Sequence, residues 1–185
     1  MGRKRRVWIP HVYHHIYSRG NNRQNIFHDE IDMTEVFRLL DMIHIEYPIS
    51  ISVFCILTNH YHFLLKSESA SISKVMCIFN KRYTDYYNRK YHHIGHVFQQ
   101  RFNSSPVLTP QNLLKVSRYI HRNPISTYMP MAMKMEDYPY CSYQYYKTST
   151  PPPYSFINIH DLPSSLYPQI NKTASQYCQY VESEI

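Results

Sequence analysis

Residues 49–65 read ISISVFCILTNHYHFLL, and this stretch decides the fold of the chain. The apolar, β-branched run at 49–57 is typical of a buried strand, and residues 60–65 have the composition of a second strand. Thr58 and Asn59 interrupt the run between them. We therefore expect a hairpin in which residues two apart in the sequence share one face of a sheet.

The segments on both sides of this hairpin extend the pattern. Asp32 is a candidate cap for a helix with apolar residues at helical spacing, and Ser71 is a candidate start for a second one. The predicted strands are 11–17, 49–57, 60–65 and 96–102, a turn is predicted at 18–22, and the predicted helices are 33–46 and 71–90. The order β-α-β-β-α-β predicts an α+β protein with a ferredoxin-like antiparallel sheet and helices on one face.

An additional helix follows this unit. Thr109 is a typical N-cap, Pro110 suits the first helical position, and the helix is expected to end near Arg122. Tyr119 and Asn123 are four residues apart and so share one face, away from the apolar stripe of the helix. The pair is a candidate for a groove-facing site, and an ordinary surface tyrosine is the alternative.

Composition limits the function. The chain has 185 residues, and its 20 Lys and Arg against 13 Asp and Glu give a net charge of +7, which fits a nucleic-acid partner. The chain has only 3 glycines, too few and too scattered for a Gly-rich phosphate-binding loop. No apolar run is long enough for a membrane span. The 4 scattered cysteines indicate neither a zinc ribbon nor a disulfide scaffold, so we expect a cytoplasmic protein with reduced thiols.

His60 and His62 are the sharpest candidate site. On a strand both imidazoles point to the same face, and Tyr61 points to the other. Two imidazoles side by side are a candidate ligand pair for a divalent metal. Because the chain has 12 histidines, a chance pair without a metal is the alternative.

These motifs occur together, and in this order, in one protein family. The stretch NHYHFLL at 59–65 resembles the HUH histidine pair of single-strand nucleases, and 119–124 resembles their tyrosine helix. Three further blocks also match: SRGNNRQNIF at 18–27, GHVFQQRF at 95–102 and DYPYCSY at 137–143. Over about residues 8–146 the chain therefore resembles the IS200/IS605-like Y1 transposases, especially their REP-associated tyrosine transposase branch.

The resemblance implies a metal-dependent single-stranded DNA endonuclease and strand transferase. It would act at hairpin-associated sites through a covalent 5′-phosphotyrosine. Tyr119 would be the nucleophile, and His60, His62 and Asn123 would bind Mg²⁺ or Mn²⁺. The family usually has a bulky apolar residue between the histidines, so Tyr61 is a mild departure.

The resemblance also implies an organisation and a partner. Residues 1–146 would form the HUH/Y1 catalytic domain, and 147–185, which include three consecutive prolines, are predicted to be a loosely structured appendage. Relatives suggest either a monomer or a homodimer. The expected partner is single-stranded DNA with hairpin structure, which implies a nucleoid-associated protein in the cytoplasm, and no membrane is involved. Candidate contacts to its phosphates are Arg3, Lys4, Arg5, Arg6, Arg19, Arg23, Lys81, Arg82, Arg89, Lys90, Arg101 and Lys115.

Two other functions remain open from the sequence. One is a non-catalytic, nucleic-acid-binding ferredoxin-like module, such as a decayed transposase. The other is an HUH nickase of the replication or relaxase type. Retention of His60, His62, Tyr119 and Asn123 argues against simple decay. The size of the chain and the blocks at 95–102 and 119–124 argue against the nickase.

Overall fold

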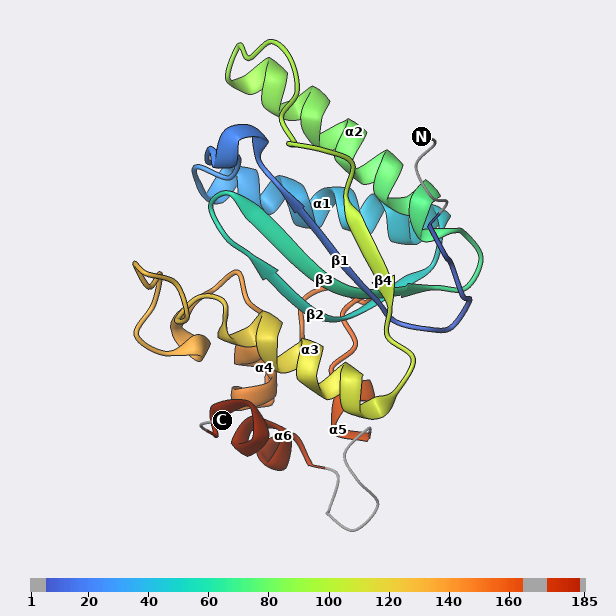
Figure 1. The fold of residues 1–185 in the computed structure, drawn as a ribbon, viewed down its shortest axis with the longest axis vertical. Coiled ribbons are helices and arrows are strands. Elements are labelled where there is room, and N and C mark those ends of the chain that lie inside the picture. Colours follow the sequence, from blue (N-terminus) through green and yellow to red (C-terminus); the bar gives the residue numbers. More distant parts are fainter. Residues whose placement is uncertain (1–5, 165–172, 184–185) are drawn as a thin grey trace.

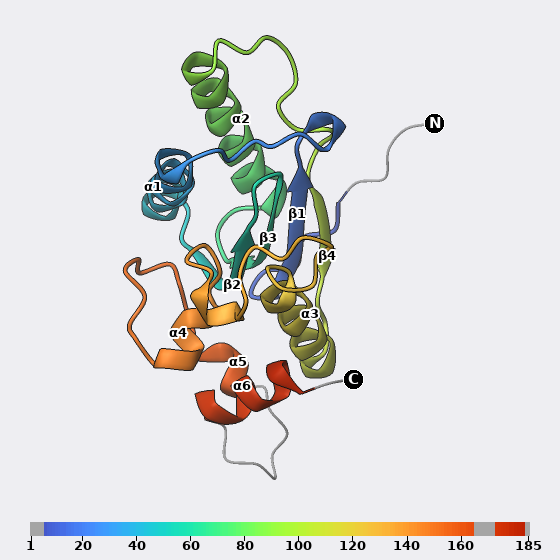
Figure 2. The same cartoon turned by 90° about the vertical axis from the view of Figure 1, so that its left-hand side faces the viewer.

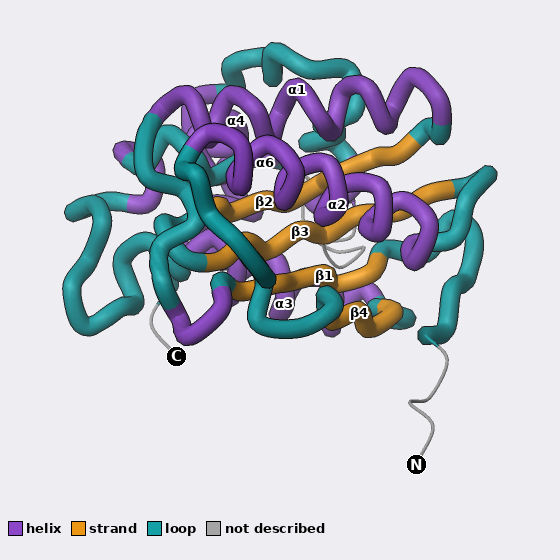
Figure 3. The backbone as a smooth tube through the Cα atoms, turned by 90° about the horizontal axis from the view of Figure 1, so that it is seen from above, coloured by secondary structure: helices purple, strands orange, loops and turns teal. Residues whose placement is uncertain are grey.

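A four-stranded antiparallel sheet forms the centre of the computed structural model, which describes residues 6–164 and 173–183 (Figure 1). Its strands are β1 (His14–Arg19), β2 (Ile49–Ile56), β3 (His60–Ser67) and β4 (Asn103–Pro106). Their spatial order is β2-β3-β1-β4 (Figure 3), and every neighbouring pair is antiparallel. The predicted hairpin is confirmed as β2 and β3.

Helices lie on both faces of this sheet (Figure 2). The helices α1 (Glu30–Glu46) and α2 (Ile72–Lys90) cover one face together, as predicted. The helix that carries Tyr119, α3 (Pro110–Arg122), lies on the other face. Within the described residues, three shorter helices lie beside α3, namely α4 (Tyr143–Thr148), α5 (Asp161–Ser164) and α6 (Ala174–Glu182). The same residues include two 3₁₀ turns, η1 (Asn21–Arg23) and η2 (Met135–Asp137). The predicted α+β, ferredoxin-like class with an additional helix is confirmed.

Strand alternation builds a separate apolar core on each face. On β3, Tyr61 and Phe63 pack toward α1 and α2, with their ring centroids 4.7 Å apart. Leu64 points the other way and joins the core that includes Leu113 of α3. Residues of β3 with even numbers therefore face α3, which places the two histidines on the side of the tyrosine helix.

The fourth strand differs from the prediction. It is formed by Asn103–Pro106, whereas residues 96–102 form the loop that precedes it. Val97 and Phe102 are buried, so the apolar character of this loop reflects anchoring to the core rather than a strand. Two other elements differ from the prediction at one end. Strand β1 extends to Arg19 rather than ending at Tyr17. The N-cap of α1 is Asp29 rather than Asp32, and the side chain of Asp29 accepts a hydrogen bond from the backbone N–H of Asp32.

The C-terminal segment, described at residues 147–164 and 173–183, was predicted to be a loose appendage. In the structure these residues pack against the rest of the chain. Ile157 forms an isolated parallel bridge with Ile51 of β2. Leu162 and Tyr177 are fully buried in the core beneath α3. The segment covers apolar surface that α3 and α4 would otherwise expose, and this burial gives a physical reason for its order. Among the described helices, none is long and apolar enough to span a bilayer.

A buried carboxylate joins α1 to α2. Asp32 is fully buried and accepts hydrogen bonds from Lys90 Nζ at 2.8 Å and from the hydroxyls of Tyr86 and Tyr91 at 2.7 Å. Burial alone would raise the pKa of Asp32, but these hydrogen bonds outweigh it and hold the pKa below its ordinary value. Lys90 also contacts the more exposed Asp29, at 2.7 Å.

We expect Asp32→Asn to lower the free energy of unfolding at pH 7 by about 1–3 kcal/mol, because the variant weakens the buried hydrogen bonds from Lys90, Tyr86 and Tyr91 while Asp29 still pairs with Lys90. The stabilisation from a carboxylate with a depressed pKa is present above its unfolded pKa of about 3.9 and is lost as the pH falls through the folded pKa. The difference between the two proteins should therefore shrink in acid. Urea unfolding followed by circular dichroism at several pH values measures it.

The matched control is Asp29→Asn. An asparagine caps a helix about as well as an aspartate, and the ion pair of Asp29 is partly exposed, so this variant should cost less than about 1 kcal/mol. Equal losses in the two variants would contradict the assigned role of Asp32.

Candidate active site

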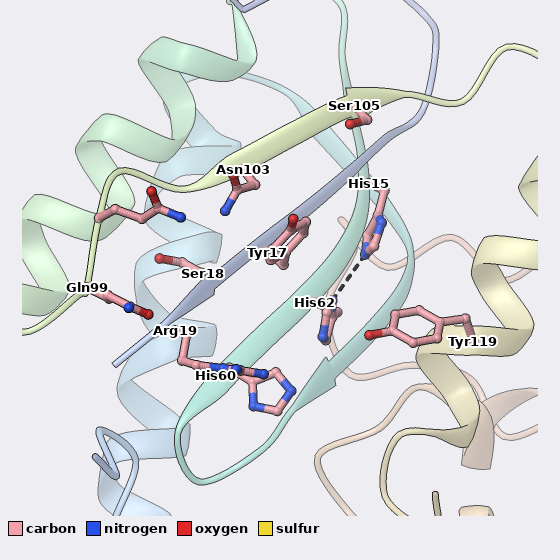
Figure 4. A pocket seen from close by; sticks show the side chains of 11 residues that line it. His15, Tyr17, Ser18, Arg19, His60, His62, Gln99, Asn103, Ser105 and Tyr119 are labelled. Atoms are coloured by element: carbon pink, nitrogen blue, oxygen red, sulfur yellow. Dashed lines mark hydrogen bonds between the residues drawn. The ribbon is translucent and has the colours of Figure 1, made fainter. Parts of the chain in front are cut away.

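A polar cavity of about 580 Å³ opens where β1 and β3 approach α3 (Figure 4). It is lined by side chains from β1, β3, β4, α3 and the loop before β4, namely His15, Tyr17, Ser18, Arg19, His60, His62, Gln99, Gln100, Asn103, Ser105 and Tyr119. Segments far apart in the sequence thus meet at one place. The cavity contains both histidines of the predicted pair and the predicted nucleophile.

His60 and His62 lie side by side on β3, with ring centroids 5.1 Å apart. The predicted alternation is confirmed, because Tyr61 between them is fully buried on the opposite face. The hydroxyl of Tyr61 donates a hydrogen bond to Asn80 of α2 at 2.8 Å. This anchor on the far face fixes the strand so that both imidazoles point toward α3.

Neighbouring side chains orient both imidazoles. His60 Nδ1 donates a hydrogen bond to the amide oxygen of Asn59, and His62 Nδ1 is joined to His15 Nε2 at 3.1 Å. Asn123 also hydrogen-bonds to His60, so its amide lies beside the histidine pair. The Nδ1 atoms of both histidines therefore have protein partners, which is the arrangement that fixes the orientation of histidine ligands in metal sites.

The histidines of the cavity are neutral at physiological pH. Burial is the main cause, and it lowers the pKa of His60 to about 4, with a further contribution from the positive charge of Arg19. Burial lowers the pKa of His62 to about 2 and that of His15 to about 4. A neutral imidazole keeps the lone pair that a metal ion requires, so no proton has to be removed near pH 7.

Helix α3 and its C-cap residue, Asn123, supply the other two predicted residues. Its N-terminus is capped by Thr109, and its buried face includes Leu113 and Ile120, which leaves Tyr119 54% exposed. The ring of Tyr119 lies 5.5 Å from that of His62, and Figure 4 shows its hydroxyl directed from α3 toward the histidines. The tyrosine and the histidine pair meet within a single chain.

Asn123 lies one turn after Tyr119, as its spacing predicts. Its Nδ2 donates a hydrogen bond to the backbone carbonyl of Tyr119 at 2.8 Å. This bond fixes the amide of Asn123, which lies beside His60. The four residues expected to form the site, His60, His62, Tyr119 and Asn123, are therefore brought together.

The predicted DNA-contacting residues separate into groups. Arg19 lines the cavity, and Lys115 lies on α3 one turn before Tyr119. A different groove of about 690 Å³, between α2 and the loop before β4, includes Arg6, Lys81 and Arg101.

The remaining basic residues lie away from the cavity lining. Arg23 and Arg89 are exposed, at η1 and at the end of α2, and Arg82 is half-buried on α2. The charge of Lys90 is compensated by Asp29 and Asp32, so this residue is engaged in holding two helices together. Arg3, Lys4 and Arg5 lie outside the described residues.

Sequence reasoning missed several residues of the cavity. His15 and Tyr17 alternate along β1 and point to the face of the histidine pair, with Tyr17 directly opposite His62 in the strand register. The period of two along β1 was the signal that could have placed them on one face. Gln99 and Asn103 enter through a loop and an edge strand, whose register cannot be derived from local sequence.

The donor set is compatible with one divalent cation. Among the described residues, no group of three or more His, Cys, Asp or Glu side chains is arranged to hold a metal ion. An ion here would depend on two imidazoles and the amide oxygen of Asn123. Such a mixed nitrogen and oxygen set suits Mg²⁺ less well than softer ions such as Mn²⁺.

Comparisons with known proteins show the fold and the family of this chain. Among solved structures, a REP-associated tyrosine transposase bound to a REP hairpin has the same fold, with a TM-score of 0.64 and 15% identity over 80% of this chain and 86% of that chain. No curated protein gave a significant match. The family profile described as "Transposase IS200 like" matches residues 9–123, the whole sheet together with α1, α2 and α3. Since that match spans more than half of the sequence and includes all four converging residues, the chain belongs to the IS200-like transposase family.

Proposed function

We propose that this protein is a metal-dependent endonuclease and strand transferase for single-stranded DNA, with Tyr119 as its nucleophile. One observation carries the proposal: Tyr119 of α3 meets His60 and His62 of β3 at one cavity, and Asn123 at the C-terminal end of that helix hydrogen-bonds to His60. Membership of a transposase family supports the assignment to DNA strand exchange.

His60, His62 and Asn123 would hold Mg²⁺ or Mn²⁺. Their donor atoms fit, because both imidazoles are neutral and held through Nδ1, and the amide nitrogen of Asn123 is engaged by the carbonyl of Tyr119. When bound, the cation would neutralise charge on the scissile phosphate and polarise it toward attack. The positive guanidinium of Arg19 lines the same cavity and would bind a non-bridging phosphate oxygen.

The covalent step belongs to Tyr119. Its phenolic oxygen attacks phosphorus, a bond forms between the two, and the bond from phosphorus to the 3′ oxygen breaks. The phenolic proton passes to water, and the departing 3′ oxygen takes up a proton from water. The products are a 5′-phosphotyrosine and a strand with a free 3′-OH. Attack of a 3′-OH on this linkage reverses the step, so strands are rejoined or transferred without ATP.

We further propose that the DNA carries a hairpin near the cleavage site. The solved relative in fold is bound to a REP hairpin, and the polar cavity of this chain exposes Tyr17 and Tyr119, which suit unpaired rather than stacked bases. A DNA-acting protein of this kind would work in the cytoplasm, at the nucleoid.

Covalent capture tests the proposed function. Hairpin oligonucleotides with randomised single-stranded flanks are incubated with the full chain in Mg²⁺, Mn²⁺ or EDTA and separated on a denaturing gel. We expect a 3′-labelled oligonucleotide to migrate with the protein when metal is present, and a 5′-labelled one to give only a shortened strand. DNA binding without an adduct in any metal would favour the non-catalytic binding module instead, and the opposite labelling pattern would contradict the 5′-phosphotyrosine.

A further inference from the structure

A second groove, of about 640 Å³, opens beside Tyr119. It is lined by residues of α3, the loop after it and α6, namely Lys115, Arg118, Tyr119, Arg122, Asn123, Ser126, Thr127 and Tyr180. Tyr119 lines this groove and also the cavity of the histidine pair, so the two hollows meet at the nucleophile.

The groove is strongly cationic. Lys115, Arg118 and Arg122 follow one another at positions i, i+3 and i+7 of α3, which places them along one side of the helix. None of the lining residues is acidic. Lys115 is exposed, so its ammonium group faces solvent at the mouth of the groove. A row of three positive side chains with Ser126 and Thr127 at one end has the chemistry of a phosphate-binding surface.

The two arginines also fix the opposite wall of the groove. Arg118 donates a hydrogen bond to the backbone carbonyl of Ser183, and its guanidinium lies 5.4 Å from the ring centroid of Tyr180. Arg122 Nη1 donates to the carbonyl of Val181 at 3.1 Å. These contacts attach the end of α6 to α3 and leave an aromatic ring at the edge of a basic channel.

We propose that this groove binds the single-stranded DNA that flanks the scissile phosphate. The proposal rests on the proposed function, which puts the scissile phosphate at Tyr119. A strand held there continues on both sides: one flank would lie in the cavity past Arg19, and the other would cross α3 along Lys115, Arg118 and Arg122. Tyr180 would stack on an unpaired base of this second flank.

The groove gives the C-terminal segment a role. Tyr180 belongs to α6, within the segment predicted to be a loose appendage. Among the described residues that line the groove, Tyr119 and Tyr180 are the two aromatic ones. The segment would thus complete the DNA-binding surface next to the nucleophile.

Binding to dT24 as a function of NaCl concentration tests the groove. Fluorescence anisotropy is measured in EDTA on the full chain carrying Tyr119→Phe, so that no covalent product interferes. Removal of one phosphate contact by Lys115→Gln should reduce the slope of log affinity against log salt by about 0.7. The matched control Lys74→Gln removes the same charge from α2, on the opposite face of the sheet, and should leave the slope unchanged.

Tyr180 gives an independent readout. Loss of base stacking in Tyr180→Leu should weaken binding of dT24 by about 5- to 100-fold with little change of the salt slope, and Tyr180→Phe should restore the affinity. Circular dichroism verifies that the leucine variant is folded. If the leucine variant is unfolded, the phenylalanine variant, which keeps the aromatic ring, still reports whether the ring rather than the hydroxyl supports binding.

The outcomes separate the groove from the chemistry. An unchanged salt slope in Lys115→Gln, together with parental affinity in Tyr180→Leu, would overturn the proposed groove even if the unmodified chain forms a covalent adduct. A reduced slope and weakened binding without any adduct in the unmodified chain would retain the groove and reject the proposed chemistry.

Discussion

Tyr119→Phe is expected to abolish the covalent protein–DNA adduct, with a loss of about 10⁴-fold or more in the rate of strand cleavage. The substitution removes one oxygen atom, the atom that would bond to phosphorus, and it keeps the ring. Tyr119 is 54% exposed, and its ring contacts His15 and His62 at their edges, so the fold does not depend on its hydroxyl. DNA affinity in EDTA should change by less than about twofold, since the aromatic surface for bases is retained.

Tyr17→Phe is the matched control for this prediction. Tyr17 lines the same cavity, is 40% exposed and lies 5.6 Å from the ring of His62, so it shares the surroundings of Tyr119. Its hydroxyl has no proposed part in the chemistry, and the variant should form the adduct at close to the parental rate. Loss of the adduct in Tyr17→Phe, with retention in Tyr119→Phe, would show that the nucleophile is wrongly assigned.

The second large effect is expected from removing both imidazoles. The double variant His60→Ala, His62→Ala should lose Mn²⁺ binding, measured by calorimetry, and strand cleavage should fall by about 10³-fold or more. Binding of single-stranded DNA in EDTA should persist, because both histidines are neutral and their removal deletes no positive charge. This separation of binding from cleavage distinguishes metal ligands from ordinary DNA contacts.

A double variant at distant histidines controls for a general effect of losing imidazoles. His92 and His160 are both exposed, and neither lines the cavity. His92→Ala, His160→Ala should bind Mn²⁺ and cleave DNA as the parent does. Cleavage that survives in the variant without His60 and His62, at the parental metal dependence, would refute the ligand assignment.

The parts of the fold that were predictable from the sequence depend on local signals. The hairpin follows from the apolar run at 49–57 and from the break at Thr58, and α3 follows from the cap at Thr109. The common face of His60 and His62 is a direct consequence of strand geometry. Their approach to Tyr119 is a tertiary contact, and it was expected only because the chain resembles a known family.

The parts that were missed depend on long-range pairing and packing. Strand β4 has the polar sequence NSSP, and it is a strand only because Tyr17 and its neighbours on β1 offer it an edge to pair with. The apolar residues before it, such as Val97, are buried loop anchors that imitate a strand in the sequence. Arg118 and Arg122 resemble ordinary solvated helix residues until the fold brings α6 against them.

The most direct test of the central claim is to locate the DNA on the protein. The adduct formed in Mn²⁺ is digested with nuclease and trypsin and analysed by mass spectrometry. Trypsin cuts after Arg118 and Arg122, so the residue in question lies in the short peptide 119–122, YIHR. A nucleotide attached through phosphate to Tyr119 is the predicted result, and a nucleotide on any other residue would contradict the account.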